Sequence, residues 1–324
     1  MSNPRVPFLL ASDRPLLAPP RPGAPLIVHV VVNVEHWSFD QPMPRKLLPA
    51  PHGDEQTPDI PNFSWAEYGL RCGMPRLFET LKRRGLAASC ALNAGVIEAY
   101  PRLAEAILDA GWEVIGHGLH QRSIQAEDRE DETIGEALKR IRSFTGKPVQ
   151  GWLGPGLRES RATPDILKSL GVRYVCDWVL DDLPSWMATV HGPLIAMPYS
   201  LETNDSVIYA VEKHASPEMW RRVEDTLQVF DGELARQPRV LTLGLHPHLI
   251  GAPHRFLYLE KMLDRLADHP QAVFMTGAQI ADWFETVSPP GAAAASFLSK
   301  SSKPSAPTPS LFPSTGVARS ASTT

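Results

Sequence analysis

The sequence predicts an α/β fold, a distorted (β/α) barrel of about seven to eight strands. Short apolar runs rich in β-branched residues alternate with amphipathic segments between residues 26 and 287. The seven or eight strand–helix repeats favour a barrel-like fold over an open sheet. Polar clusters follow the apolar runs directly, which is typical of a site at the carboxyl ends of barrel strands.

The elements are expected in the following order. The run LIVHVVVNV at 26–34 predicts a strand covered on both faces. A helix is expected at 74–84, with Pro75 near its start and Gly85 after its end. The later strands are short apolar runs at 87–92, 113–115, 149–153, 172–176, 194–198, 240–245 and 272–275. Helical segments between them are expected at 101–110, 132–144, 163–170, 217–232, 256–267 and 277–286.

The two ends of the chain differ from its middle. Residues 1–25 are rich in proline and are expected to form an extended arm over the surface. Residues 288–324 are mostly Ser, Pro, Ala and Thr, a composition that cannot bury a core and that predicts a disordered tail. The catalytic domain is therefore expected at 26–287.

Composition narrows the functional class. A net charge of −4 argues against a nucleic-acid binder, which would need a basic face. The three cysteines are too few and too scattered for a disulfide framework or a thiolate zinc site. No apolar stretch suits a signal peptide or a membrane span. We expect a cytoplasmic protein with no membrane partner.

The most informative cluster follows the strand expected at 113–115. His117 and His120 stand three positions apart and can point the same way if the segment coils into a helix. The position four residues after His117 holds Gln121, which is a poor metal ligand. This strand exit suggests a site that handles a metal or a proton.

Two further strand exits carry ionisable groups. Glu35 follows the first strand. An ionised carboxylate next to a buried strand costs free energy unless it has a partner or takes part in the chemistry of a site. His246 directly follows the strand at 240–245. We predict Glu35, His117 and His246 as catalytic residues. Polar and aromatic residues at these and other strand exits are candidate substrate contacts: Asn33, Trp152, Pro155, Arg158, Asp181, Asp182, Trp186 and Asp205. Taken singly, the tryptophans would suit the wall and the core better than a platform for a sugar, and Asp181 and Asp182 could belong to a solvated turn.

These motifs together resemble the polysaccharide deacetylase superfamily, also called carbohydrate esterase family four or NodB-homology proteins. The motifs are Asn-Val-Glu-His-Trp, Gly-His-Gly-x-x-Gln, Gly-Trp-Leu-Gly-Pro-Gly, Asp-Trp-x-x-Asp-Asp-x-Pro and Leu-His-Pro-x-x-x-Gly. The chain is most similar to the branch of metal-independent allantoinases and cytoplasmic peptidoglycan-deacetylase-like proteins, over about residues 26–286. The resemblance implies a NodB-type barrel, hydrolysis of a carbon–nitrogen bond and a homotetramer.

The resemblance also implies roles for individual residues. The family's first motif has an acidic general base and an acidic metal ligand, and Asn33 and Glu35 fall on those places. A shift of one residue would instead put Glu35 and His36 there. The second motif holds a divalent metal with two histidines four apart, where this chain has His117 and Gln121. The last motif has a histidine that acts as general acid, and His246 matches it.

Two mechanisms stay open at this point. Glu35, His117 and Gln121 could hold a metal, zinc if any, but only weakly because an amide replaces a histidine; His36 or His120 could substitute. Without a metal, Glu35 would activate water with its pKa raised by the apolar strand around it. His117, Gln121 and backbone amides would then polarise the scissile carbonyl, and His246 would protonate the leaving nitrogen.

The substrate expected from the sequence is a small soluble amide, ureide or amino sugar. Arg158 could hold a carboxylate of that substrate, and Asp181, Asp182 or Asp205 could meet its N–H groups. A metal-dependent carbohydrate N-deacetylase is one alternative. An inactive relative that only binds a ligand is another.

Overall fold

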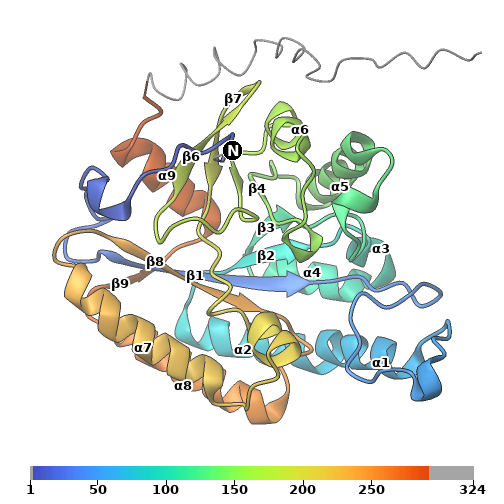
Figure 1. Ribbon diagram of the computed structural model, residues 1–324. Helices are drawn as coiled ribbons and strands as arrows, with labels where there is room; N and C mark the ends of the chain where they lie inside the picture. The colour runs from blue at the N-terminus through green and yellow to red at the C-terminus, as the bar shows by residue number, and fades with distance from the viewer. Residues whose placement is uncertain (1–2, 292–324) are drawn as a thin grey trace, which may run out of the picture.

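The computed structural model describes residues 3–291 (Figure 1). The predicted disorder of the tail concerns mainly residues 292–324, which lie outside the described residues. One mixed sheet organises the chain. Its main path runs β6 (Ser185–Thr189), β7 (Gly192–Ala196), β5 (Tyr174–Val175), β4 (Gly151–Trp152), β3 (Glu113–Gly116), β2 (Ser89–Leu92), β1 (Leu26–Val34) and β8 (Arg239–Leu245). The last strand, β9 (Ala272–Phe274), pairs with the start of β1.

The sheet curls into the distorted (β/α) barrel that the sequence predicts. All strand pairs are parallel except β6 with β7. The far edge of β8 bonds to chain segments that flank the β6–β7 hairpin. The Val240 N–H donates to the Asp182 carbonyl at 2.9 Å, and the Gly244 N–H to the Thr203 carbonyl at 3.1 Å. These bonds draw the two ends of the sheet together.

Helices cover the outside of the curled sheet. In Figure 1, α7 (Glu218–Glu233) and α8 (Pro253–Ala267) run side by side near β8, with α2 (Met74–Arg84) below β1. The other helices are α1 (Ile60–Tyr68), α3 (Val96–Ala99), α4 (Pro101–Asp109), α5 (Glu130–Thr145), α6 (Thr163–Ser169) and α9 (Gly277–Val287). Among residues 3–291, no helix is long and apolar enough to cross a membrane.

Side chains of β1 alternate between two cores, as the two-residue period of a strand requires. Leu26, Val28 and Val30 pack with α2, α7 and α8 outside the sheet. Ile27 and Val31 belong to a second core that contains residues of α9. Asn33 and Glu35 continue this second series, which directs them toward the inside of the barrel.

Several local predictions needed correction. The strands expected at 149–153 and 172–176 are only two residues long in the sheet, as β4 and β5. No sequence pattern predicts α1, the π-helical turn η3 (Gly69–Gly73) or the second π-helical turn η6 (Ser206–Val211). Strand β6 was also not predicted; it pairs antiparallel with β7 and places Trp186 inside a strand rather than after one.

Candidate active site

A cavity of about 1160 Å³ opens at the carboxyl ends of β1, β3 and β8. The structure brings most of the predicted site residues to it. Those that line the cavity are Asn33, Glu35, His36, His117, His120, Gln121, Pro155, Arg158 and His246. Predicted residues from four separate stretches of the sequence thus converge on one space.

Glu35 lies at the centre of the three predicted catalytic residues. Its Oε1 atom lies 3.6 Å from His246 Nε2 and 4.0 Å from His117 Nε2. Its other oxygen, Oε2, accepts a hydrogen bond of 2.7 Å from Trp37 Nε1. Burial raises the pKa of the Glu35 carboxyl, while His246 and the Trp37 bond oppose that shift. Glu35 therefore presents one free carboxylate oxygen between two imidazoles.

Asp205 fixes the orientation and charge of His246. Its Oδ1 atom accepts from His246 Nδ1 at 2.6 Å, and its Oδ2 accepts from the backbone N–H groups of His246 and Ile250 at 2.7 and 3.2 Å. Burial lowers the pKa of His246, but the Asp205 and Glu35 carboxylates outweigh that effect and the net pKa is raised. The imidazolium is thus favoured, with its Nε2 proton facing Glu35. Asp205 is fully buried and does not line the cavity, so its predicted contact with substrate is corrected to a contact with His246.

His117 has the opposite protonation state. Its Nδ1 atom bonds to the Leu153 carbonyl, and because a carbonyl oxygen only accepts, Nδ1 must carry the ring proton. Burial lowers the pKa of His117 to about 4, so the ring is neutral at pH 7. Its Nε2 atom then carries a lone pair and no proton. This atom has no hydrogen-bond partner among residues 3–291. The expectation that His117 polarises the scissile carbonyl is therefore corrected: Nε2 can accept a hydrogen bond but not donate one.

The donor atoms do not fit a three-ligand zinc site. Glu35 and His117 each offer one good ligand atom, and the third candidate is the neutral amide oxygen of Gln121, which is buried and also has no partner among the described residues. Residues 3–291 contain no cluster of three His, Cys, Asp or Glu side chains that could hold a metal. The two predicted substitutes, His36 and His120, bond to each other through their Nδ1 atoms at 2.7 Å. The Nδ1 atoms of both substitutes are therefore engaged with each other rather than with Glu35, His117 or Gln121.

Four further predicted substrate contacts, besides Asp205, lie away from the cavity and are corrected. Trp152 is fully buried in the core formed with α5, because it points to the helix side of the sheet. Trp186 stacks near Phe284 of α9 and donates to the Ser288 carbonyl at 2.7 Å. Asp181 forms an ion pair of 3.0 Å with Arg14. Asp182 lies beside the start of β8, whereas His246 follows its end.

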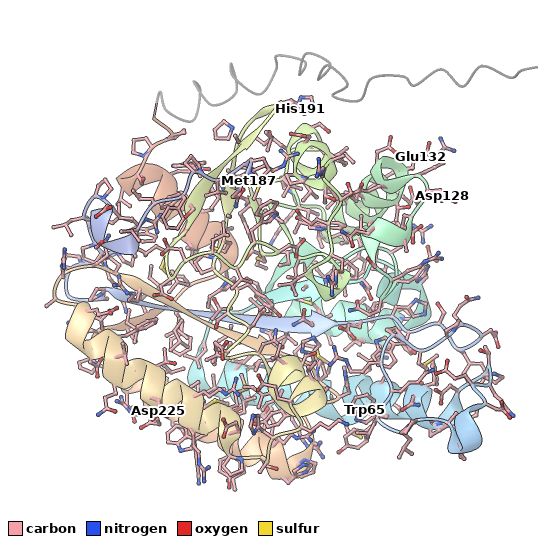
Figure 2. The ribbon with its side chains drawn as sticks, viewed as in Figure 1. Trp65, Asp128, Glu132, Met187, His191 and Asp225 are labelled. Carbon is pink, nitrogen blue, oxygen red and sulfur yellow. The ribbon has the colours of Figure 1, made fainter. Side chains whose placement is uncertain are left out.

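Other cavity residues were missed by the sequence analysis. Trp37 could have been found, since it stands two residues after Glu35 and an extended chain puts such residues on one side. Tyr199 and Asn204 lie in the segment that follows β7, where Asp205 was the only residue predicted to belong to the site. His248, also on the cavity wall, packs against Trp65 of α1 at a ring-centroid distance of 4.7 Å, and Trp65 is labelled in Figure 2. No pattern in the sequence links that helix to the site.

Comparisons with known proteins agree with this architecture. The family model for polysaccharide deacetylase matches residues 63–175. The chain is 28% identical over 257 residues to an inferred polysaccharide deacetylase of Schizosaccharomyces pombe, covering 72% of this chain and 79% of that protein. It is 24% identical over 271 residues to the peptidoglycan deacetylase of Helicobacter pylori, covering 72% and 90% of the two chains. The crystal structure of Puue allantoinase is similar with a TM-score of 0.75 and 25% identity, covering 86% of this chain and 96% of that one.

Proposed function

Since the chain belongs to the polysaccharide deacetylase superfamily and is a hydrolase of carbon–nitrogen bonds other than peptide bonds, we propose that it cleaves a small soluble amide or ureide without a catalytic metal. The observation that carries the proposal is the position of Glu35 Oε1 between two histidines of different charge. It lies 3.6 Å from Nε2 of His246, which favours its charged form, and 4.0 Å from Nε2 of His117, which is neutral. Glu35 can act as a general base, His246 as a general acid, and His117 as an acceptor of a hydrogen bond, all at the same place in the cavity.

Glu35 and His117 are suited to hold the attacking water. The 4.0 Å between Glu35 Oε1 and His117 Nε2 exceeds a direct hydrogen bond, but a water molecule can donate to both atoms over about 2.8 Å each. Its lone pair then points away from both acceptors and toward a substrate carbonyl. As the oxygen attacks the carbonyl carbon, Glu35 takes one proton from the water.

His246 is suited to complete the reaction. The tetrahedral intermediate collapses when its carbon–nitrogen bond breaks, and the nitrogen must receive a proton to leave as an amine. The Nε2 proton of the His246 imidazolium is the donor. Asp205, bonded to Nδ1 at 2.6 Å, stabilises the charged ring before this transfer and holds it in place. The products are a carboxylic acid and an amine, and Glu35 then returns its proton to solvent or to His246.

The charges on the cavity wall support an anionic or strongly polar substrate. Three arginines line the cavity, Arg45, Arg122 and Arg158, whereas Glu35 is the one acid among its lining residues. Arg122 is paired with Glu127 at 3.3 Å. Arg158 forms no ion pair within residues 3–291, so we propose that it binds a carboxylate or carbonyl of the substrate.

A panel of amides tests the proposed function. Allantoin, hydantoins, formamides and N-acetylglucosamine oligomers would be incubated with the wild-type protein and with Glu35→Gln. We expect the wild type to hydrolyse at least one small amide or ureide and the variant to be inactive on it. Equal rates for the two proteins, or no hydrolysis of any compound, would overturn the proposal.

One observation favours a second candidate, a metal-dependent carbohydrate N-deacetylase. The buried acceptors His117 Nε2 and Gln121 Oε1 both lack partners among the described residues and border the same cavity as Glu35. Zinc-stimulated release of acetate from N-acetylglucosamine oligomers, with no hydrolysis of small ureides, would favour this candidate over the first.

We also propose that the protein is cytoplasmic and forms a homotetramer, as the resemblance implies. Light scattering on the purified full-length chain gives the mass directly, and a value near that of one chain would reject the tetramer. Fractionation of cells that express the natural gene tests the location.

A further inference from the structure

Tyr199 lies in the segment that leaves β7 and borders the catalytic cavity. Its side chain is almost fully buried, at 1% exposure, among residues of the inner core. The phenol oxygen contacts two amide side chains, Asn33 from β1 and Asn204 from the segment that bridges to β8. It therefore connects three parts of the barrel at the level of the active site.

The hydrogen bonds to Tyr199 run in a direction that the structure fixes. Asn33 Nδ2 donates to the phenol oxygen at 2.9 Å and to the Leu245 carbonyl at 3.2 Å, and a carbonyl oxygen only accepts. Asn204 Nδ2 donates to the same oxygen at 3.2 Å, while its Oδ1 accepts the Ser206 N–H at 2.9 Å. Backbone groups thus determine which atom is the amide nitrogen in Asn33 and in Asn204. The phenol oxygen of Tyr199 must therefore accept a hydrogen bond from each of these two side chains.

The phenol proton is consequently left for another partner. A phenol offers one donor and two acceptor positions, and here both acceptor positions are occupied. Among residues 3–291, Tyr199 has no acceptor for its own O–H. The cavity that Tyr199 borders is where such an acceptor can bind.

The phenol is held rigidly in this orientation. A Cβ atom added to Gly244 of β8 would lie 2.9 Å from the phenol oxygen and 2.7 Å from Asn204 Nδ2, so glycine is required for the close fit of the strand against this pair. Burial raises the pKa of Tyr199, with Asp205 and Glu35 adding to the shift, so the phenol keeps its proton at neutral pH. A fixed, protonated donor needs no reorganisation during a reaction.

We propose that Tyr199 is a catalytic residue that donates its O–H to the oxyanion of the tetrahedral intermediate, an inference that rests on the proposed hydrolysis. The carbonyl oxygen gains negative charge when water adds, and a hydrogen-bond donor aimed at it stabilises that charge. His117 cannot supply this donor, since its Nε2 has no proton. Tyr199 provides this hydrogen bond and keeps its own proton. The bonds formed and broken, and the proton transfers by Glu35 and His246, are therefore the same as in the mechanism above.

Binding of methylphosphonate tests the inference independently of turnover. This tetrahedral anion mimics the intermediate of acetamide hydrolysis, and calorimetry would compare its affinity for wild type and Tyr199→Phe. We expect the variant to bind it about 10- to 100-fold more weakly, the usual effect of losing a hydrogen bond to a charged group. Tyr209→Phe is the matched control, since Tyr209 is a buried tyrosine with a hydrogen bond of its own to the Ser216 carbonyl. Its affinity should equal that of wild type.

Kinetics on an amide that the wild type hydrolyses provide the second readout. Tyr199→Phe should lower kcat by about 10²- to 10³-fold with KM nearly unchanged, at a temperature where the variant is shown to be folded. A purely structural role would instead lower thermal stability and leave the kcat of the folded fraction unchanged.

The outcomes separate the two proposals. Equal affinity of wild type and Tyr199→Phe for methylphosphonate, or no binding to the wild type, would overturn the role of Tyr199, as would an unchanged kcat. If methylphosphonate binding depends on Tyr199 but no amide is hydrolysed, the oxyanion donor stands and the proposed function fails.

Discussion

Glu35 and His246 need opposite charge states in the same buried space, and their neighbours provide them. Burial opposes both charges, but each of these residues stabilises the other's charged form. Asp205 adds a second carboxylate on the far side of His246, which favours the imidazolium further. The pair is thereby prepared with a base and an acid before substrate arrives.

Replacing Glu35 tests the base. Glu35→Gln keeps the shape of the side chain and the bond from Trp37 but removes the carboxylate, so kcat/KM should fall by about 10²- to 10⁴-fold. Asp182→Asn is the matched control, because Asp182 does not line the cavity, and it should keep the wild-type rate. A Glu35→Gln variant that retains its rate would contradict the assignment of the base.

The pH dependence of kcat/KM tests the acid. Activity should rise as Glu35 loses its proton, at a pKa that burial raises above the ordinary range of a glutamate, and fall as His246 loses its proton, at a pKa that Asp205 and Glu35 raise above the ordinary range of a histidine. In Asp205→Asn the carboxylate that raises the pKa of His246 is gone. Its alkaline limb should therefore move to lower pH, and a limb at unchanged pH would show that another group is titrating.

The sequence could predict some of these residues and not others. The alternation along β1 places Glu35 and Asn33 inside the barrel, and the strand exits point to His117 and His246. The sequence could not indicate which ring nitrogen of His117 carries the proton, because this depends on the Leu153 carbonyl, 36 residues away. Nor could it indicate Tyr199, whose chemistry depends on amides from two other segments.

At the scale of elements, the π-helical turn η3 holds the loop that carries His246. A Cβ on Gly69 would overlap the backbone of His248, and one on Gly73 would overlap the carbonyl of Pro247. The two glycines allow the helical backbone to lie directly against the loop. His248 also packs against Trp37 and Trp65, with 5.4 and 4.7 Å between ring centroids.

Gly69→Ala tests this close approach. The added methyl group would push the loop away, so we expect a loss of about 1–3 kcal/mol in unfolding free energy and a reduced kcat through displacement of His246. Gly135→Ala in α5 is the control, since a Cβ there meets no atom within 4 Å. That variant should gain about 0.5–1 kcal/mol from its better helix propensity. Urea unfolding measures both, and equal stabilities would argue against the contact.

Elements were predictable where their pattern is local. The long apolar run of β1 and the amphipathic helices α2, α7 and α8 are found at nearly the predicted bounds. The hairpin of β6 with β7 was missed because Ser185–Thr189 has no continuous apolar run and is a strand only through its pairing. Trp186 and Asp182 were wrongly assigned to the site for the same reason, because their positions depend on how this hairpin pairs with distant parts of the chain.

At the scale of the whole molecule, the barrel gathers side chains from distant parts of the chain into one cavity. The count of strand–helix repeats was sufficient to predict that closure, and the comparisons confirm the class of fold. Which strand exits share the cavity depends on the order of strands in the sheet. Because β8 lies next to β1, His246 meets Glu35 across more than 200 residues of sequence.

We propose that Glu35 and His246 hydrolyse a carbon–nitrogen bond without a catalytic metal. Turnover of freshly purified protein, before and after removal of metals by a chelator, tests it most directly when zinc content is measured on the same samples. Gln121→His completes a histidine pair four residues apart and is the positive control for zinc binding. We expect wild-type kcat/KM to be unchanged by the chelator and independent of zinc content. Stoichiometric zinc in the wild type, with turnover that the chelator abolishes and added zinc restores, would contradict it.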